Sequence, residues 1–137
     1  MNRLPSSLLA LGFAAICVAE AAAAEAPPLA GDYRMQGRGF APADSPYQGT
    51  CSLRGDGPVY DVSCFNADTR HTYVGRGLAD GDTLAIFIGD SLRGDHGGIF
   101  AGEYLVLYRR QSNGVLEGTW IAAASSAAGR ETLTPLR

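Results

Sequence analysis

From residue 31 onward, apolar and polar residues alternate with a period of two in short stretches rich in Tyr, Val, Ile, Leu and Thr. Such alternation is typical of β-strands that bury one face, and no stretch keeps the 3.6-residue period of an amphipathic helix. The pattern predicts eight strands, at residues 31–38, 46–54, 58–65, 71–78, 83–89, 102–110, 115–122 and 130–135.

Turn-forming residues stand between several neighbouring strands. Gly55-Asp56-Gly57, Asp80-Gly81-Asp82 and Ser112-Asn113-Gly114 each separate two of them, and such residues favour tight hairpin turns. A longer glycine-containing loop, 94–98, precedes the sixth strand. Consecutive hairpins predict an all-β fold, a small eight-stranded antiparallel up-and-down barrel, in which closure leaves no exposed strand edge. A β-sandwich is the alternative.

Three strands share a repeated unit, in which a large apolar residue is followed two positions later by glycine. The units are Tyr47-x-Gly49, Tyr73-x-Gly75 and Leu116-x-Gly118. Glycine weakens a strand unless the strand bends sharply or another group approaches closely. Because a small barrel needs sharp bends to close, we expect these glycines at bends.

Cys51 and Cys64 are predicted to form one disulfide between neighbouring strands. If they face each other, Leu53 faces Val62, and the turn centres on Gly57-Pro58, where turn residues already stand. Closing a loop of this length stabilises a protein by about 3 kcal/mol in the chain-entropy model.

The N-terminal segment has the pattern of an export signal. Arg3 is followed by the apolar run 8–19 and by Ala22-x-Ala24, which fits a cleavage site. The run is shorter than the roughly 20 residues of a membrane span, and Cys17 lies inside it. We expect a signal peptide at 1–24, a flexible tail at 25–30 and the barrel domain at 31–137. The mature protein is then periplasmic or secreted, with no membrane attachment.

Composition excludes several classes of function. All 11 residues counted as Lys+Arg are arginine, which excludes Schiff-base chemistry, a lysine-bound cofactor and a P-loop lysine. The net charge of −3 is unlike that of a nucleic-acid-binding protein. No cofactor and no nucleic-acid partner are expected.

Seven short segments follow one another in a fixed order. They are Gly31-x-Tyr33, Tyr47-x-Gly49-Thr50, Tyr73-x-Gly75-x-Gly77, Gly81-Asp82-x-Leu84, Tyr108-Arg109, Gly114-x-Leu116-x-Gly118-x-Trp120 and Glu131-Thr132-Leu133-Thr134-Pro135. The series resembles a family of small exported bacterial proteins of unknown function, some of which are labelled fibronectin-binding. The resemblance covers nearly the whole chain after residue 24 and implies a calycin-like barrel, the architecture of lipocalins and avidins. It also implies that Arg130 packs on Tyr33, which stands where a lipocalin has tryptophan.

Candidates for catalysis and metal binding are scattered. His71 and His96 have Asp68 and Asp95 near them in sequence, but the Gly-x-Ser-x-Gly segment of a hydrolase is absent. Metal candidates are Asp90, Asp95 and His96, with Asp80 and Asp82 on an adjacent turn. They lack the EF-hand spacing, and Asp also simply makes turns. We predict no enzyme, no catalytic residue and no metal site, with a hydrolase kept as an alternative.

Arg-Gly-Asp occurs twice, at 54–56 and 93–95, as in integrin-binding adhesion proteins. Gly-Asp is also ordinary turn chemistry, and the first copy falls in a predicted hairpin turn. Adhesion is therefore an alternative and not the main prediction.

The aromatic residues suggest a binding function. On inward-facing positions they would either fill the barrel, the favoured interpretation, or line an apolar pocket with polar groups. We predict a non-enzymatic binding module whose partner is a small hydrophobic ligand or an exported protein. A periplasmic inhibitor of a protease or lysozyme, binding through loops 90–98 and 121–129, is the alternative. The predicted ligand contacts are Tyr33, Tyr60, Tyr73, Tyr104, Tyr108 and Trp120.

Overall fold

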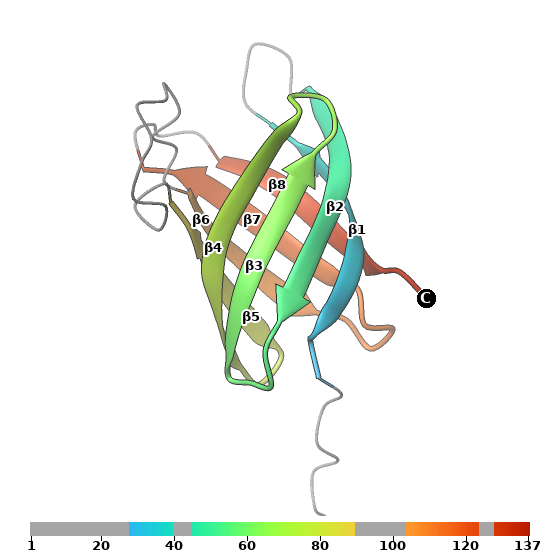
Figure 1. Cartoon of the computed structure of the whole chain (residues 1–137), viewed down its shortest axis with the longest axis vertical. Helices are drawn as coiled ribbons and strands as arrows, with labels where there is room; N and C mark the ends of the chain where they lie inside the picture. Colours follow the sequence, from blue (N-terminus) through green and yellow to red (C-terminus); the bar gives the residue numbers. More distant parts are fainter. Residues whose placement is uncertain (1–27, 40–44, 90–103, 124–127) are drawn as a thin grey trace, which may run out of the picture.

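The structure is a computed structural model that describes residues 28–39, 45–89, 104–123 and 128–137, and these form one closed antiparallel barrel (Figure 1). Each strand pairs with its neighbours in sequence, and β1 also pairs with β8. The predicted eight-stranded up-and-down barrel is therefore confirmed. The strands are β1 (Gly31–Arg38), β2 (Pro46–Arg54), β3 (Val59–Asn66), β4 (His71–Asp80), β5 (Thr83–Ile88), β6 (Tyr104–Arg110), β7 (Leu116–Ala122) and β8 (Ala128–Pro135).

The predicted disulfide is confirmed, together with its register. Cys51 on β2 lies opposite Cys64 on β3, and their sulfur atoms are 2.03 Å apart. In the same ladder Leu53 lies opposite Val62. The bond joins two neighbouring strands inside the barrel wall, and both cysteines are buried.

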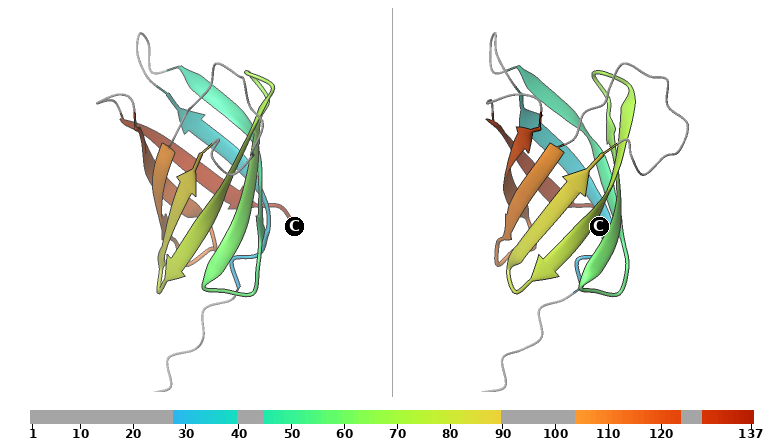
Figure 2. Two further views of the ribbon diagram at one scale, coloured as in Figure 1. Left: turned by 60° about the vertical axis from the view of Figure 1, so that its left-hand side comes forward. Right: turned by 90° about the vertical axis from the view of Figure 1, so that its left-hand side faces the viewer.

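The barrel has two ends that differ in how they are built. The lower end in Figure 1 contains the start of β1, the end of β8 and the β2–β3, β4–β5 and β6–β7 turns. At the upper end β1 connects to β2, β3 to β4, β5 to β6, and β7 to β8. The two views in Figure 2 show the strands running between these ends around the whole circumference.

The lower half of the interior is filled by apolar side chains. Leu53, Leu84, Leu116 and Leu133 are each at most 1% exposed. Leu29, just before β1, belongs to the same core, and its carbonyl accepts a hydrogen bond of 2.7 Å from the Tyr33 hydroxyl. Leu29 therefore packs into the lower end.

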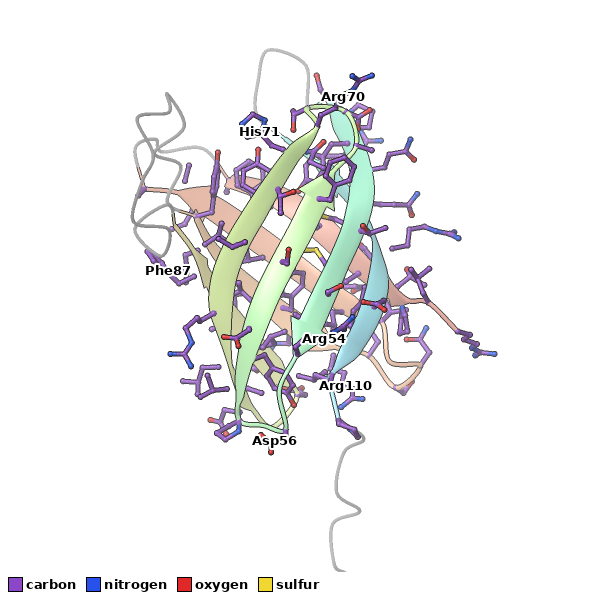
Figure 3. All side chains as sticks on the ribbon, in the orientation of Figure 1. Arg54, Asp56, Arg70, His71, Phe87 and Arg110 are labelled. Carbon is purple, nitrogen blue, oxygen red and sulfur yellow. A yellow bond between two sulfur atoms is a disulfide. The ribbon has the colours of Figure 1, made fainter. Side chains whose placement is uncertain are left out.

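Ion pairs lie on the outer surface. Arg54 pairs with Asp32 at 2.6 Å and also donates to the Gly31 carbonyl at 3.0 Å. The Ser52 hydroxyl, followed by Arg54, lowers the pKa of Asp32. The arginine of the first Arg-Gly-Asp is thus hydrogen-bonded to the start of β1 at the lower end of the barrel (Figure 3), and the second copy lies outside the described residues.

The expectation that Arg130 packs on Tyr33 is wrong. Arg130 lies opposite Arg38 at the upper end, whereas Tyr33 lies opposite Pro135 at the lower end. The arginine whose charge acts on the Tyr33 hydroxyl is Arg110, at the end of β6, although burial raises the pKa of Tyr33 more than Arg110 lowers it. Among the described residues, no helix is long and apolar enough to cross a membrane.

Candidate functional site

The upper half of the barrel contains a cavity of about 190 Å³ that opens to solvent. Its position follows from the strands that line it, since the lining residues lie on the upper parts of β1 to β8. Most of the wall is apolar or aromatic. The polar groups are the side chains of Asn66 and Glu131 and the hydroxyls of the three lining tyrosines. The lining residues are Met35, Gly39, Tyr47, Cys64, Asn66, Tyr73, Ile88, Tyr104, Val106, Trp120 and Glu131.

Three aromatic rings form a continuous wall of this cavity. Tyr73 and Tyr104 meet edge to face, with ring centroids 5.9 Å apart and planes at 90°. Tyr104 and Trp120 meet in the same way at 5.7 Å and 79°. Because neighbouring rings are nearly perpendicular, the wall of the cavity contains both ring edges and ring faces.

A carboxyl group lies inside the barrel beside this wall. Glu131, on β8, accepts a hydrogen bond of 2.7 Å from the Tyr47 hydroxyl and another from the Tyr108 hydroxyl. Burial raises the pKa of Glu131, against a smaller lowering by the two hydrogen bonds. Burial, followed by the Glu131 charge, likewise raises the pKa values of Tyr47 and Tyr108. Both hydroxyls therefore stay protonated and donate.

Glycines opposite the aromatic residues make room for the rings. Gly37 lies opposite Tyr47, and Gly118 lies opposite Tyr108. A Cβ added at either glycine would overlap the facing ring. The same holds for Gly129 and Trp120. These glycines therefore allow each ring to lie flat over the neighbouring strand. For Tyr47 and Tyr108, this position brings the hydroxyl within hydrogen-bonding distance of Glu131.

Asn66 and Asp68 organise the turn between β3 and β4 at the upper end. The Asn66 side-chain oxygen accepts from the backbone N–H groups of Asp68 and Thr69 at 3.0 and 3.1 Å. The Asp68 carboxylate accepts from the Gln48 N–H at 2.9 Å. His71 has its Nδ1 at 3.3 Å from the Thr69 carbonyl and lies at the upper rim (Figure 3).

Among the described residues, the remaining candidates for catalysis and metal binding do not lie together in one site. Asp90, Asp95 and His96 lie outside them. Asp82 is paired with Arg109 on the outer surface at 3.4 Å. Within the described ranges, no group of three potential metal ligands comes together.

The aromatic residues predicted to contact a ligand are distributed over both halves of the barrel. Tyr73, Tyr104 and Trp120 line the cavity. Tyr108 lies beneath it and donates to Glu131, while Tyr33 and Tyr60 lie in the filled lower half.

The predicted ligand contacts include only Tyr73, Tyr104 and Trp120 of the lining residues, and they omit the hydrogen-bonded pair Glu131 and Tyr47. Glu131 is two positions before Leu133 on one strand and therefore shares its inward face. Tyr47 shares a face with Cys51 by the same rule, so the period of two could have found both.

A second depression, of about 690 Å³, lies at the upper end between β1, β2 and β8, and it shares Tyr47 and Glu131 with the inner cavity. Its lining includes Arg38, Gln48, Asp68 and Arg130, which are exposed. It is larger than the inner cavity, and both are open to solvent. The inner cavity is the better candidate because its walls are apolar and its polar groups converge.

Comparisons with known proteins give little further information. No known protein family and no curated protein sequence matches the chain. Among solved structures, the apo form of lipid binding protein 8 from Caenorhabditis elegans is similar over 79% of this chain and 95% of that chain, with 9% sequence identity and a TM-score of 0.45. The fold assignment, a closed eight-stranded antiparallel up-and-down barrel, depends on the strand order and closure of this chain itself.

Proposed function

We propose that the protein is a binding module that holds one small, mainly hydrophobic ligand in the upper cavity. The observation that carries this proposal is the cavity of about 190 Å³, with aromatic walls and a hydrogen-bonded carboxyl at one side. A hollow of this kind costs stability, because its lining side chains lose packing contacts that a filled core would give. In the lower half of the barrel, the inward-facing positions of the same strands include leucines that fill the interior.

The size of the cavity limits the ligand. An apolar cavity of roughly 150 Å³ is enough to bind benzene, whereas pockets for drug-sized ligands start at about 300 Å³. The expected ligand is therefore a single-ring molecule with one polar substituent, and a long-chain lipid would not fit inside. Trp120, which is the only tryptophan of the chain, lines the cavity and provides a fluorescence signal for binding.

The test is a titration of the protein with single-ring compounds (toluene, benzyl alcohol and benzylamine), followed by Trp120 emission and by calorimetry. We expect saturable one-to-one binding of at least one of them. Val106→Phe, which places a ring inside the cavity, should abolish it. Leu107→Phe is the matched control, because Leu107 is the next residue on β6 and is exposed outside. Absence of binding by the whole panel would refute the proposal.

We also propose that the protein works after export. The Cys51–Cys64 disulfide supports an oxidising compartment, and the predicted signal peptide lies outside the described residues. Protein recovered from the producing cells should have the mass of a chain that lacks residues 1–24, with no free thiol. An intact mass that retains the segment, or a reactive thiol, would contradict export.

A second candidate function, binding to an exported protein target, is favoured by an apolar patch on the outer face of β4–β7. Phe87, Leu105 and Ile121 lie side by side on β5, β6 and β7, and the next outward row contains Leu78 and Leu107. These five side chains are between 42% and 57% exposed, and Figure 3 shows Phe87 pointing away from the barrel. Contiguous exposed apolar surface often marks a protein interface.

This second candidate has its own test. A photo-crosslinking residue at position 107 should capture one specific protein in the producing cells, and the same residue at Thr50, exposed on β2, should not. Equal labelling from both positions would argue against the patch as an interface. The inhibitor alternative remains a prediction, because its loop 90–98 lies outside the described residues.

A further inference from the structure

The inner carboxyl lacks a positively charged partner from the protein. The groups that shift the pKa of Glu131 are burial itself and the hydroxyls of Tyr108 and Tyr47, with no arginine among them. Those hydroxyls are neutral donors. The Glu131 side chain is only partly exposed, and acidic side chains that are largely removed from water usually pair with a cation or take up a proton.

The arginines closest to Glu131 in the strand ladder, Arg38 and Arg130, are exposed and border the second depression. Next to Glu131, β1 has Gly37 and β7 has Gly118, while Tyr47 and Tyr108 reach it from β2 and β6. Every arginine on the described strands is exposed except Arg110, which lies at the lower end beside Tyr33. His71, at the upper rim, packs against Tyr73 with ring centroids 6.2 Å apart.

The wall beside Glu131 suits a cation. Faces of tryptophan and tyrosine rings attract ammonium groups, tryptophan most strongly. The wall formed by Tyr73, Tyr104 and Trp120 borders the same cavity as the Glu131 carboxyl. An anionic ligand would meet a carboxyl and ring faces of the same sign, whereas an ammonium ion is attracted by both.

We propose that the ligand is a small organic cation, an amine joined to a single ring, with Glu131 as its counter-ion and Tyr73, Tyr104 and Trp120 as its aromatic wall. This inference rests on the proposed function, since it requires that the cavity binds a small molecule. Its ring fills the apolar part of the cavity, and its ammonium group lies between the carboxyl and the aromatic faces. Tyr47 and Tyr108 hold the carboxylate in place.

The experiment compares benzylamine, benzyl alcohol and benzoate, which share one ring and differ in charge. With the disulfide-bonded wild-type protein at neutral pH, we expect benzylamine to bind at least tenfold more tightly than benzyl alcohol, and benzoate to bind least. Equal affinity for the amine and the alcohol would overturn the cation assignment and leave the ligand-binding function standing. If none of the three binds, the proposed function itself fails.

Two variants locate the effect in the residues named. Glu131→Gln keeps the size and an acceptor oxygen for the tyrosines, and should reduce the preference for benzylamine over benzyl alcohol to less than twofold. Tyr104→Leu should weaken benzylamine more than benzyl alcohol, because only the cation gains from the ring face. A Glu131→Gln protein that is folded by circular dichroism and keeps the full preference would refute the role of Glu131.

Binding should also depend on pH in a way that a neutral ligand does not share. The amine requires the carboxylate, so its affinity should fall at acidic pH as Glu131 takes up a proton, while benzyl alcohol binds equally throughout. His71→Asn is included to remove the histidine at the rim. A flat pH profile for benzylamine in this variant would contradict the ion pair.

Discussion

The two ends of the β7–β8 pair are built differently although the strands are continuous. At the lower end Leu116 lies opposite Leu133, and both are completely buried. Two positions higher Gly118 lies opposite Glu131, and two positions higher again Trp120 lies opposite Gly129. The inward face thus changes from a leucine pair, through a carboxyl, to a ring that covers a glycine.

This difference shows how one barrel can contain both a core and a cavity. Two facing leucines project toward the barrel axis and meet the leucines of other strands. A ring that lies over a glycine covers the wall, and the space in front of it stays open. At Trp120 and Gly129 the glycine lets the ring lie against the wall of the cavity, so one pair of strands contributes both to the packed core and to the hollow.

The largest expected effect comes from shortening a side chain in the filled half. Leu133→Ala should lower the free energy of unfolding by about 4 kcal/mol, because it removes buried methyl groups and leaves a void in a packed region. Ile88→Ala, in the wall of the existing cavity, should lower it by only about 2 kcal/mol, because that side chain is already partly unpacked. Urea unfolding followed by circular dichroism measures both. Equal losses would show that the two halves are packed alike.

The disulfide stabilises the whole barrel and not one half of it. Replacing both Cys51 and Cys64 by Ala should reduce the free energy of unfolding by about 3 kcal/mol, as expected for the closure of a loop of this length. Reduction of the wild-type protein should reproduce most of this loss in thermal unfolding. A double variant as stable as the oxidised wild type would show that the bond contributes nothing.

A smaller effect is expected where a ring covers a glycine. Gly129→Ala places a methyl group in the space of the Trp120 ring and should destabilise the barrel by about 2 kcal/mol. It should also shift the Trp120 emission, because the ring must move. The control is Thr134→Ala, at an exposed position of the same strand, which should change stability by less than about 0.5 kcal/mol. An unchanged emission spectrum in Gly129→Ala would contradict the packing described here.

The smallest expected effect on the free energy of unfolding comes from the ionisation of Glu131, which lies between the filled and the hollow half. Because the pKa of Glu131 is raised in the folded protein, the folded state holds this proton more tightly than the unfolded state does. Stability from this group is complete below the ordinary pKa of glutamate and is lost as the pH rises through the raised value. Wild type should therefore lose stability relative to Glu131→Gln over that window. Asp32, whose pKa is lowered, is present in both proteins and cancels in the difference.

The sequence predicted the barrel and much of its register from local rules. The turn at Gly57-Pro58 and the two cysteines together specified the β2–β3 pairing, which the structure confirms. The start of β8 at Ala128 instead of residue 130 was missed, because the small residues before Arg130 have no clear alternation.

The site was less predictable than the fold. Alternation shows that Glu131 faces inward, but only three-dimensional packing shows that Tyr47 and Tyr108 reach it from other strands. The glycines were assigned to bends. In the structure Gly118 makes room for the Tyr108 ring, which depends on cross-strand register and not on local sequence. The division into a filled and a hollow half depends on side chains from all eight strands. It therefore cannot be predicted from any single segment of the sequence.

The first and last strands both reach the lower end, where the Leu136 N–H donates to the Asp32 carbonyl at 2.8 Å. Whatever is joined to either end of the described domain is therefore held at the side away from the cavity. A tag, a surface linker or a fused enzyme could be attached there without blocking the upper cavity. The proximity of the two ends also permits a circularly permuted chain, opened at the β3–β4 turn, with the barrel wall unchanged.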